Sequence, residues 1–149
     1  MPVKSAPAVL LLALLSAICA ASAASADGAE LRVGKLRCED QTNPLGIDAP
    51  QPRLSWQIAS EGRGVLQTAY RITVSSAANR EGDLWDSGKR AGDQSTHVLY
   101  AGKPLRSSRQ YSWKVQVWDG DATASSEPAT WTMGVLPEDA WQAQWIAAP

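Results

Sequence analysis

Carboxylates are the residues of this 149-residue chain that could most directly do chemistry. Two Asp or Glu side chains across a cleft are enough to hydrolyse a glycosidic bond, with one acting as acid and the other as base or nucleophile. Every candidate lies in or beside turn-like sequence, where Asp is favoured because its side chain bonds to the backbone. No two of them form an evident acid and base couple. The candidates are Glu39, Asp40, Asp48, Asp83, Asp86, Asp119 and Asp121.

Other catalytic and metal-binding patterns are absent from the sequence. The single histidine, His97, lies in the candidate strand THVLY, with no acidic residue or cysteine at a metal-ligating spacing. The DGD triplet at Asp119 to Asp121 has too few acidic ligands for Ca²⁺, so a hairpin turn is the better interpretation. No Gly-rich phosphate loop, G-x-S-x-G elbow or Cys–His pair is present. We therefore expect no catalytic residue, no metal site and no cofactor in this chain.

Tryptophan is the more informative residue type. The chain has seven Trp and three Tyr but no Phe, and the indole ring suits both sugar stacking and packing between domains. Trp113 and Trp118 lie five residues apart in QYSWKVQVWDGD, so within a strand they face opposite sides of the sheet. Trp113 shares its side with apolar residues and is predicted to lie in the core. Trp118 shares its side with polar residues and is predicted to lie at the outer surface or the strand's end.

Three interpretations remain open for Trp118. It is an isolated surface indole at a sheet edge, a contact to a neighbouring domain, or a platform for sugar stacking. Trp85, in DLWDSG, is a further candidate for ligand or domain contact. A strand end closed by a Ser-Gly turn explains the same residues.

The elements that must position these side chains are short β-strands. Four segments alternate apolar and polar residues with a period of two, which is typical of half-buried antiparallel strands. Weaker strand candidates and turns rich in Gly, Pro, Asn and Asp lie between them. About seven short strands predict an all-β fold, a fibronectin type III or immunoglobulin-like antiparallel β-sandwich. The four segments are RLSWQIAS, AYRITVSS, YSWKVQVWD and ATWTMGV.

Two further aromatic residues have predicted structural roles. Trp56 shares one strand face with Leu54 and Ile58, so we expect it in the core. Tyr111 opens a long strand six residues after Leu105, which is the arrangement of a tyrosine corner. In that motif the phenol hydroxyl bonds to the upstream backbone and fixes the crossing between the sheets.

The first 26 residues have the features of a secretory signal peptide. Lys4 precedes the apolar run AVLLLALLSAICAASA, which is too short to span a bilayer, and A-x-A cleavage sites end at Ala23 or Ala26. Ile18 precedes Cys19, which argues against lipid attachment. We expect a secreted or periplasmic protein with no membrane association after cleavage. Only Cys38 then remains, so no internal disulfide can form, and a small buried hydrophobe is the interpretation we favour.

Charge and composition complete the expected organisation. A formal net charge of −1, from 14 basic and 15 acidic residues, gives no electrostatic footprint for nucleic acid or an anionic membrane. The expected parts are a signal peptide (1–26), a sandwich (27–136), and a linker or the start of a following domain (137–149). In this last part Trp141 and Trp145 lie four residues apart, so a short helical turn would place both on one side. Both are candidates for a ligand or domain interface.

Taken in order, several motifs resemble the N-terminal fibronectin type III-like module of bacterial α-L-rhamnosidases. These motifs are LRCED, NPLGID, PRLSW, QTAYRITVSS, DLWDSGK, YAGKPLRSSRQYSWKVQVWD, WTMGVL and DAWQAQWI. In that family the module precedes further β-sandwich domains and a large (α/α)₆ barrel, whose acidic residues hydrolyse terminal α-L-rhamnose with inversion. No position of this chain matches the barrel, so the resemblance carries over no catalytic residue. The family pattern continues past W-x-A-x-W-I, so we expect the chain to be a fragment.

The resemblance implies one function and leaves two others open. It implies a non-catalytic accessory module that supports adjacent domains, absent here, of a secreted α-L-rhamnosidase. The alternative is a free-standing carbohydrate-binding module, in which Trp118, Trp85 or Trp141 stacks on rhamnosides or plant polysaccharide. An enzyme in its own right is the least expected of the three.

Overall fold

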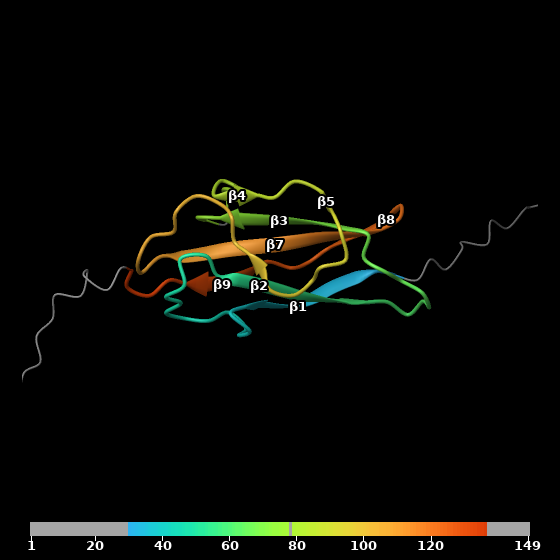
Figure 1. Ribbon diagram of the computed structural model, residues 1–149, viewed down its shortest axis with the longest axis horizontal. Helices are drawn as coiled ribbons and strands as arrows, with labels where there is room; N and C mark the ends of the chain where they lie inside the picture. Colours follow the sequence, from blue (N-terminus) through green and yellow to red (C-terminus); the bar gives the residue numbers. More distant parts are fainter. Residues whose placement is uncertain (1–29, 78, 137–149) are drawn as a thin grey trace, which may run out of the picture.

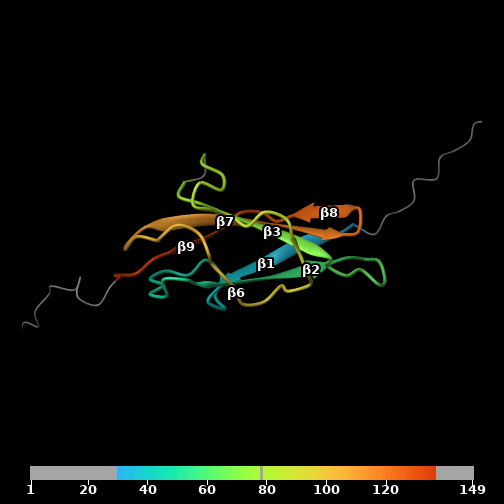
Figure 2. The ribbon, with the colours of Figure 1, turned by 45° about the horizontal axis from the view of Figure 1, so that its top comes forward.

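The computed structural model describes residues 30–77 and 79–136, which form two packed antiparallel sheets (Figures 1 and 2). Three strands form one sheet, in the order β1 (Arg32–Cys38), β2 (Arg53–Ala59) and β6 (Val98–Leu99). The second sheet has β4 (Trp85–Asp86), β3 (Ala69–Ser75), β7 (Gln110–Asp119) and β8 (Ala122–Ser125) in order, with β5 (Arg90–Ala91) on β3 and β9 (Ala129–Thr132) on β7. This arrangement confirms the predicted all-β immunoglobulin-like sandwich. Within the described residues no helix is long and apolar enough to cross a membrane.

The nine strand segments occupy seven positions, because two positions are interrupted. β4 and β5 both pair with β3, and β8 and β9 both pair with β7. β8 and β9 are separated near Ser126, whose amide donates to the carbonyl of Val115 while its hydroxyl accepts from the Val115 amide. The sequence predicted turns where β5 lies and no strand for β8. Both segments are short and mostly exposed, so they show no clear alternation of apolar and polar residues. They form strands because they pair with β3 and β7.

The core forms where β3 and β7 face the three-stranded sheet. The register of these two strands pairs Ile72 with Val115 and Val74 with Trp113, and all four side chains are buried. Trp113 is 1% exposed. Burial of a side chain of this size contributes about 2–3 kcal/mol to stability. The alternation along β7 thus directs one row of side chains inward and leaves the other row on the outer surface of the sheet.

Trp56 is also buried, and its indole nitrogen has a buried partner. Nε1 of Trp56 donates to Oε1 of Gln67 at 2.9 Å, and Nε2 of Gln67 donates to the carbonyls of Gly92 and Gln94. Gln67 is only 5% exposed, so this side chain connects the core indole to the segment that leads into β6. A buried polar group is tolerated here because its hydrogen bonds are made.

Cys38 ends β1 as a buried, free thiol. Burial raises its pKa to about 12, and nearby Glu39 adds to the increase. The thiolate that would react as a nucleophile or bind a metal is therefore disfavoured. Cys38 is a small apolar core residue, as predicted.

The described chain starts and finishes at opposite ends of the sandwich (Figures 1 and 2). The end at which it finishes is called the exit end, and it contains residues 39–52, 76–77, 79–84, 100–109 and 133–136. Tyr111 holds one of these loops, because its hydroxyl accepts a 2.7 Å hydrogen bond from the backbone amide of Arg106. This contact is the tyrosine corner that the sequence indicates.

Candidate functional site

Three of the seven candidate carboxylates are engaged in strong local contacts. Asp86 accepts from the guanidinium of Arg71 at 2.8 Å, and this hydrogen bond is the main reason that its pKa is lowered to about 2. The hydrogen bond from Arg53 likewise lowers the pKa of Glu39, and the hydroxyl of Ser76 lowers that of Asp83. A general acid needs a raised pKa near neutral pH. These three groups therefore act as ionised structural partners, and the described residues hold no cluster of three or more metal-ligating side chains.

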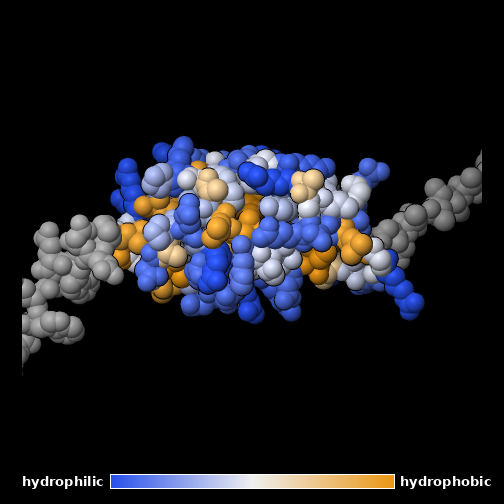
Figure 3. Space-filling model, viewed as in Figure 1, coloured by the Kyte–Doolittle hydropathy of each residue, from blue (hydrophilic) through white to orange (hydrophobic). Residues whose placement is uncertain are grey.

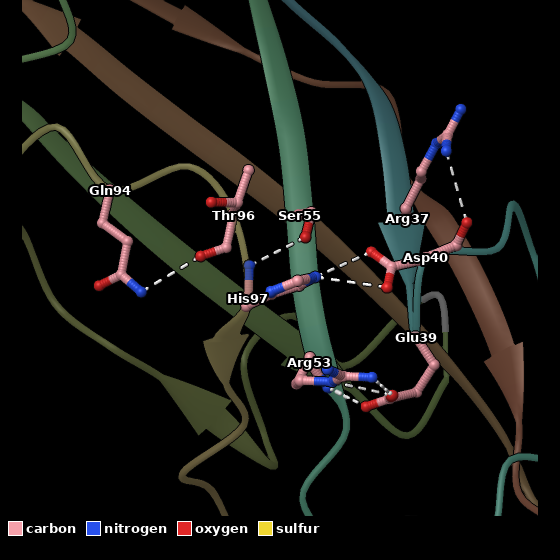
Figure 4. A network of polar contacts seen from close by, with 8 residues as sticks. All are labelled: Arg37, Glu39, Asp40, Arg53, Ser55, Gln94, Thr96 and His97. Atoms are coloured by element: carbon pink, nitrogen blue, oxygen red, sulfur yellow. Dashed lines mark hydrogen bonds and ion pairs between the residues drawn. The ribbon is translucent and has the colours of Figure 1, made fainter.

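His97 lies beside a carboxylate that the sequence did not connect to it (Figure 4). Its Nε2 is 3.0 Å from Oδ1 of Asp40. The sequence favoured a surface or strand histidine over a metal ligand, and His97 is an exposed residue, but its spacing gave no sign of this carboxylate partner. His97 immediately precedes β6 with a φ of 51°, and β6 pairs with β2, the neighbour of the strand that Asp40 follows. The contact depends on the sheet order, because the two residues are 57 positions apart.

The same network contains a serine, but its geometry is not that of an acyl-transfer triad (Figure 4). The hydroxyl of Ser55 accepts from the backbone amide of His97 at 3.0 Å. A triad requires the imidazole ring to accept a hydrogen bond from the serine hydroxyl. Among the described residues, no hydrogen bond joins the ring of His97 to the hydroxyl of Ser55. Arg53 and Glu39 lie in the same network, where the side chain of Arg53 donates at 3.0 and 2.7 Å. This network joins the loop after β1 to β2 and to the residue that precedes β6.

Trp118 lies on the outer side of the larger sheet, and it is partly exposed. The ammonium of Lys89 is 4.6 Å from the centre of its ring, at a distance typical of a cation–π contact. In the register of the sheet Trp118 is opposite Ala69 on one side and Thr123 on the other. A lysine therefore already contacts the indole that was a candidate sugar platform.

Trp85 is a partly exposed residue that packs against the core. Its ring meets the ring of Tyr100 nearly edge to face, with centroids 5.4 Å apart. Gly102 lies against both residues, so closely that a Cβ atom there would be 2.5 Å from the Cβ of Trp85. The two remaining candidates, Trp141 and Trp145, lie outside the described residues.

A groove of about 720 Å³ opens at the exit end, and it is called the exit groove here. Four basic side chains and two partly buried leucines are among the residues that line it. Lys103 donates to the backbone carbonyl of Asp83 across this groove. The three arginines that line the groove are exposed, so their guanidinium groups are available to a partner from outside the sandwich. The residues concerned are Arg80, Lys103, Arg106, Arg109, Leu84 and Leu105.

Two large apolar side chains are exposed at the same end. Leu45 is 81% exposed and Val135 is 43% exposed. Their segments are joined by backbone hydrogen bonds, since Pro44 accepts from Thr132 and Ile47 accepts from Gly134. Figure 3 shows apolar surface at this end of the molecule, beside the point where the described chain finishes.

The sequence pattern indicated neither the exit groove nor this apolar surface. The groove is built from Ser76, Arg80, Asp83 and Leu84, which follow β3, and from the segment from Lys103 to Tyr111, and only the fold brings these two parts together. A weak signal was present, since the segment KPLRSSR has three basic residues within seven positions. The apolar Leu45 in NPLGID looked like an ordinary turn residue.

Comparison with known proteins identifies related domains. Residues 33–137 match the model of a family described as Rha78A-like, N-terminal immunoglobulin domain. An α-L-rhamnosidase of Streptomyces avermitilis is 46% identical over 123 residues, which is 80% of this chain and 12% of the relative. An α-L-rhamnosidase of Formosa agariphila is 40% identical over 75% of this chain and 12% of its own length. The chain thus spans about an eighth of the length of these relatives.

Solved structures give the same result. The structure of Streptomyces avermitilis α-L-rhamnosidase in complex with L-rhamnose matches with a TM-score of 0.75 and 44% identity, over 80% of this chain and 12% of that one. An α-L-rhamnosidase structure from Dictyoglumus thermophilum matches with a TM-score of 0.74 and 36% identity, over 78% of this chain and 14% of that one.

Proposed function

This chain belongs to the family of Rha78A-like N-terminal immunoglobulin domains, and we propose that it is the non-catalytic accessory module of a secreted α-L-rhamnosidase. Its relatives are α-L-rhamnosidases, which supports this activity for the parent enzyme. The chain matches only 12% of each relative, which supports an accessory role for the module. Hydrolysis of terminal α-L-rhamnose would then take place in other domains. The predicted signal peptide supports secretion or a periplasmic location.

The observation that carries the proposal is the way the chain leaves the sandwich. The hydroxyl of Ser107 donates to the carbonyl of Leu136 at 2.6 Å and accepts from its amide at 2.8 Å. Gly134 donates to Ile47 at 2.7 Å, and Met133 donates to Arg109 at 2.9 Å. These hydrogen bonds hold residues 133–136, the last part of the described chain, against the sandwich. An exit of this kind suits a module that holds the next domain in one orientation.

The surface around the exit supports a scaffolding mechanism. Leu45 and Val135 present apolar area next to the exit, and isolated domains keep such area small unless it is used for contact. A neighbouring domain seated on these side chains would bury them, which adds to the stability of both domains. The adjacent domains of the parent enzyme are therefore the partners that we propose.

A free-standing carbohydrate-binding module that uses rhamnosides or plant polysaccharide has less support. A sugar platform needs an open aromatic face, and the ammonium of Lys89 lies over the ring of Trp118. Trp85 packs against Tyr100. A saturable change in Trp fluorescence with L-rhamnose would favour this alternative, and we expect none.

Deletion of residues 30–136 from an α-L-rhamnosidase that carries this module tests the proposal. We expect a lower melting temperature for the deleted enzyme, because the surface that the module covers becomes exposed. The purified chain alone should release no p-nitrophenol from the p-nitrophenyl α-L-rhamnoside. An unchanged melting temperature after deletion, or hydrolysis by the chain alone, would contradict it.

A further inference from the structure

We propose that the exit groove binds the segment of this same chain that directly follows it, residues 137–146. The groove has a volume of about 720 Å³ and combines basic with apolar lining residues. Its occupant should therefore carry acidic and large apolar side chains together. The segment PEDAWQAQWI has both, with Glu138 and Asp139 followed by Trp141 and Trp145.

The charges of the groove and of the segment are complementary. Arg80, Arg106 and Arg109 are exposed lining residues. In the part of the chain that the structure describes, none of these three guanidinium groups forms an ion pair, whereas Arg32, Arg53 and Arg71 each do. Asp83 also lines the groove, so four basic side chains face one carboxylate, and the two acidic residues at the start of the segment supply further negative charge. Arginine is well suited to this contact, because its planar group donates two hydrogen bonds to one carboxylate.

The apolar parts also correspond. Leu84 and Leu105 line the groove and pack against the core, so their remaining surface is available to a ligand. Trp141 and Trp145 lie on one side of a helical turn if the segment adopts one. An indole seated on these leucines beside Arg106 would gain both burial and a cation–π contact. Trp and Arg are the residue types that most often dominate binding energy at interfaces.

The chain can reach the groove from its exit. Leu136 is bound to Ser107, which directly follows the lining residues Leu105 and Arg106. An extended chain covers at most about 3.3–3.6 Å per residue, so the five residues from 137 to 141 span up to about 18 Å. Arg106 and Leu105 are one and two residues from Ser107, so that length exceeds the separation along the loop between the exit and these lining residues.

The inference gives the proposed function a physical basis, because a docked segment would set the position of the next domain firmly. Only this link to the next domain rests on the proposed function, and the docking itself does not. The test below uses the chain itself and no parent enzyme. A negative result would therefore leave the accessory role standing, and a failed deletion experiment would leave the docking standing.

Limited chymotrypsin digestion of the full chain, followed by mass spectrometry, tests the docking. The measured quantity is the cleavage rate after Trp141, relative to the rate in a free peptide of residues 137–149 with the same substitutions. We expect the native chain to be cleaved at least tenfold more slowly than its peptide. The double variants R106E/R109E and E138K/D139K should each lose most of this protection. Combining all four substitutions should restore it, because the two charges are exchanged.

Two controls keep the result interpretable. R63E reverses an exposed arginine in the loop at the opposite end of the sandwich and should leave the protection unchanged. If thermal unfolding shows that R106E/R109E does not fold, E138K/D139K decides alone, since it alters no described residue. Cleavage of the native chain at the rate of the free peptide, or protection that both charge reversals leave intact, would overturn the proposal.

Discussion

The phenol oxygen of Tyr111 lies 2.7 Å from the backbone nitrogen of Arg106, so the second residue of β7 fixes the loop that leads into it. The same loop provides Leu105 and Arg106 to the exit groove and Ser107 to the chain exit. One buried hydroxyl thus connects the core with the surface that we propose to be functional. Tyr111 itself is only 5% exposed.

Replacing Tyr111 with Phe should destabilise the module by about 1–3 kcal/mol, because the amide of Arg106 loses its acceptor. Urea unfolding measures this free energy. Tyr70→Phe is the matched control, since Tyr70 is also buried and no hydrogen bond of its hydroxyl occurs among the described residues. Equal effects of the two substitutions would show that the hydroxyl of Tyr111 has no special role.

Gly102→Ala should destabilise the sandwich by overpacking, at a cost of about 1–3 kcal/mol. A Cβ atom at this position would lie 2.5 Å from both the Cβ of Trp85 and the hydroxyl of Tyr100, and 2.7 Å from the carbonyl of Leu84. Gly34→Ala is the control, because its Cβ would meet nothing within 4 Å. Thermal unfolding of both variants measures the difference. A Gly102→Ala protein as stable as the control would mean that the Trp85 contact is not held as described.

Gln67→Leu should cost about 1–3 kcal/mol, because Nε1 of Trp56 would remain buried without an acceptor. Gln94→Ala removes a nearby exposed amide and keeps the backbone carbonyl to which Gln67 donates, so its effect should be small. Urea titration with Trp fluorescence measures both. The interpretation fails if the exposed substitution is the more damaging one.

Stability should depend on pH through Asp86. Its pKa in the folded protein is lowered to about 2, chiefly by the hydrogen bond from Arg71, while an unfolded Asp titrates near 3.9. A lowered folded pKa gives stability that is complete above the unfolded pKa and is lost as pH falls from about 4 to 2. Both side chains are more than a third exposed, so solvent screening makes the contribution small.

The Asp86→Asn variant isolates this contribution. The stability difference between the native chain and the variant should be largest near neutral pH and should shrink between about pH 4 and pH 2. Urea unfolding across this pH range measures it. A difference that stays constant down to pH 2 would show that the carboxylate of Asp86 does not interact with Arg71 in solution.

The sequence predicted the parts of the fold that local alternation determines. The inward rows of β2, β3 and β7 could be located residue by residue, and so could Trp113 in the core, since a strand's side chains alternate strictly. β5 and β8 could not, because they are mostly exposed and are held by pairing with longer strands. The contact between His97 and Asp40 could not be predicted for a similar reason. The two residues are 57 positions apart, and only the order of strands in the sheet brings them together.

The surface features were harder to predict than the core. Trp118 was recognised as an outer residue, but its contact with Lys89 depends on the connection between β4 and β5, which both pair with β3. The exit groove combines two segments that are separate in the sequence, so no single motif carries it. The exposure of Leu45 appears only once its loop is seen to turn outward at the exit end.

The most direct test of the accessory role is the melting temperature of an α-L-rhamnosidase that carries this module with the substitutions Leu45→Asp and Val135→Asp. Both side chains are exposed in the module alone, so its own stability should change little. The matched control is Leu66→Asp, since Leu66 is 69% exposed in the loop at the opposite end. Our account predicts that the exit-end double variant lowers the melting temperature of this module's unfolding transition within the enzyme by several degrees, as loss of about 1–2 kcal/mol from a domain of this size would, and that the control does not. Equal melting temperatures for the native enzyme and the exit-end variant would contradict it.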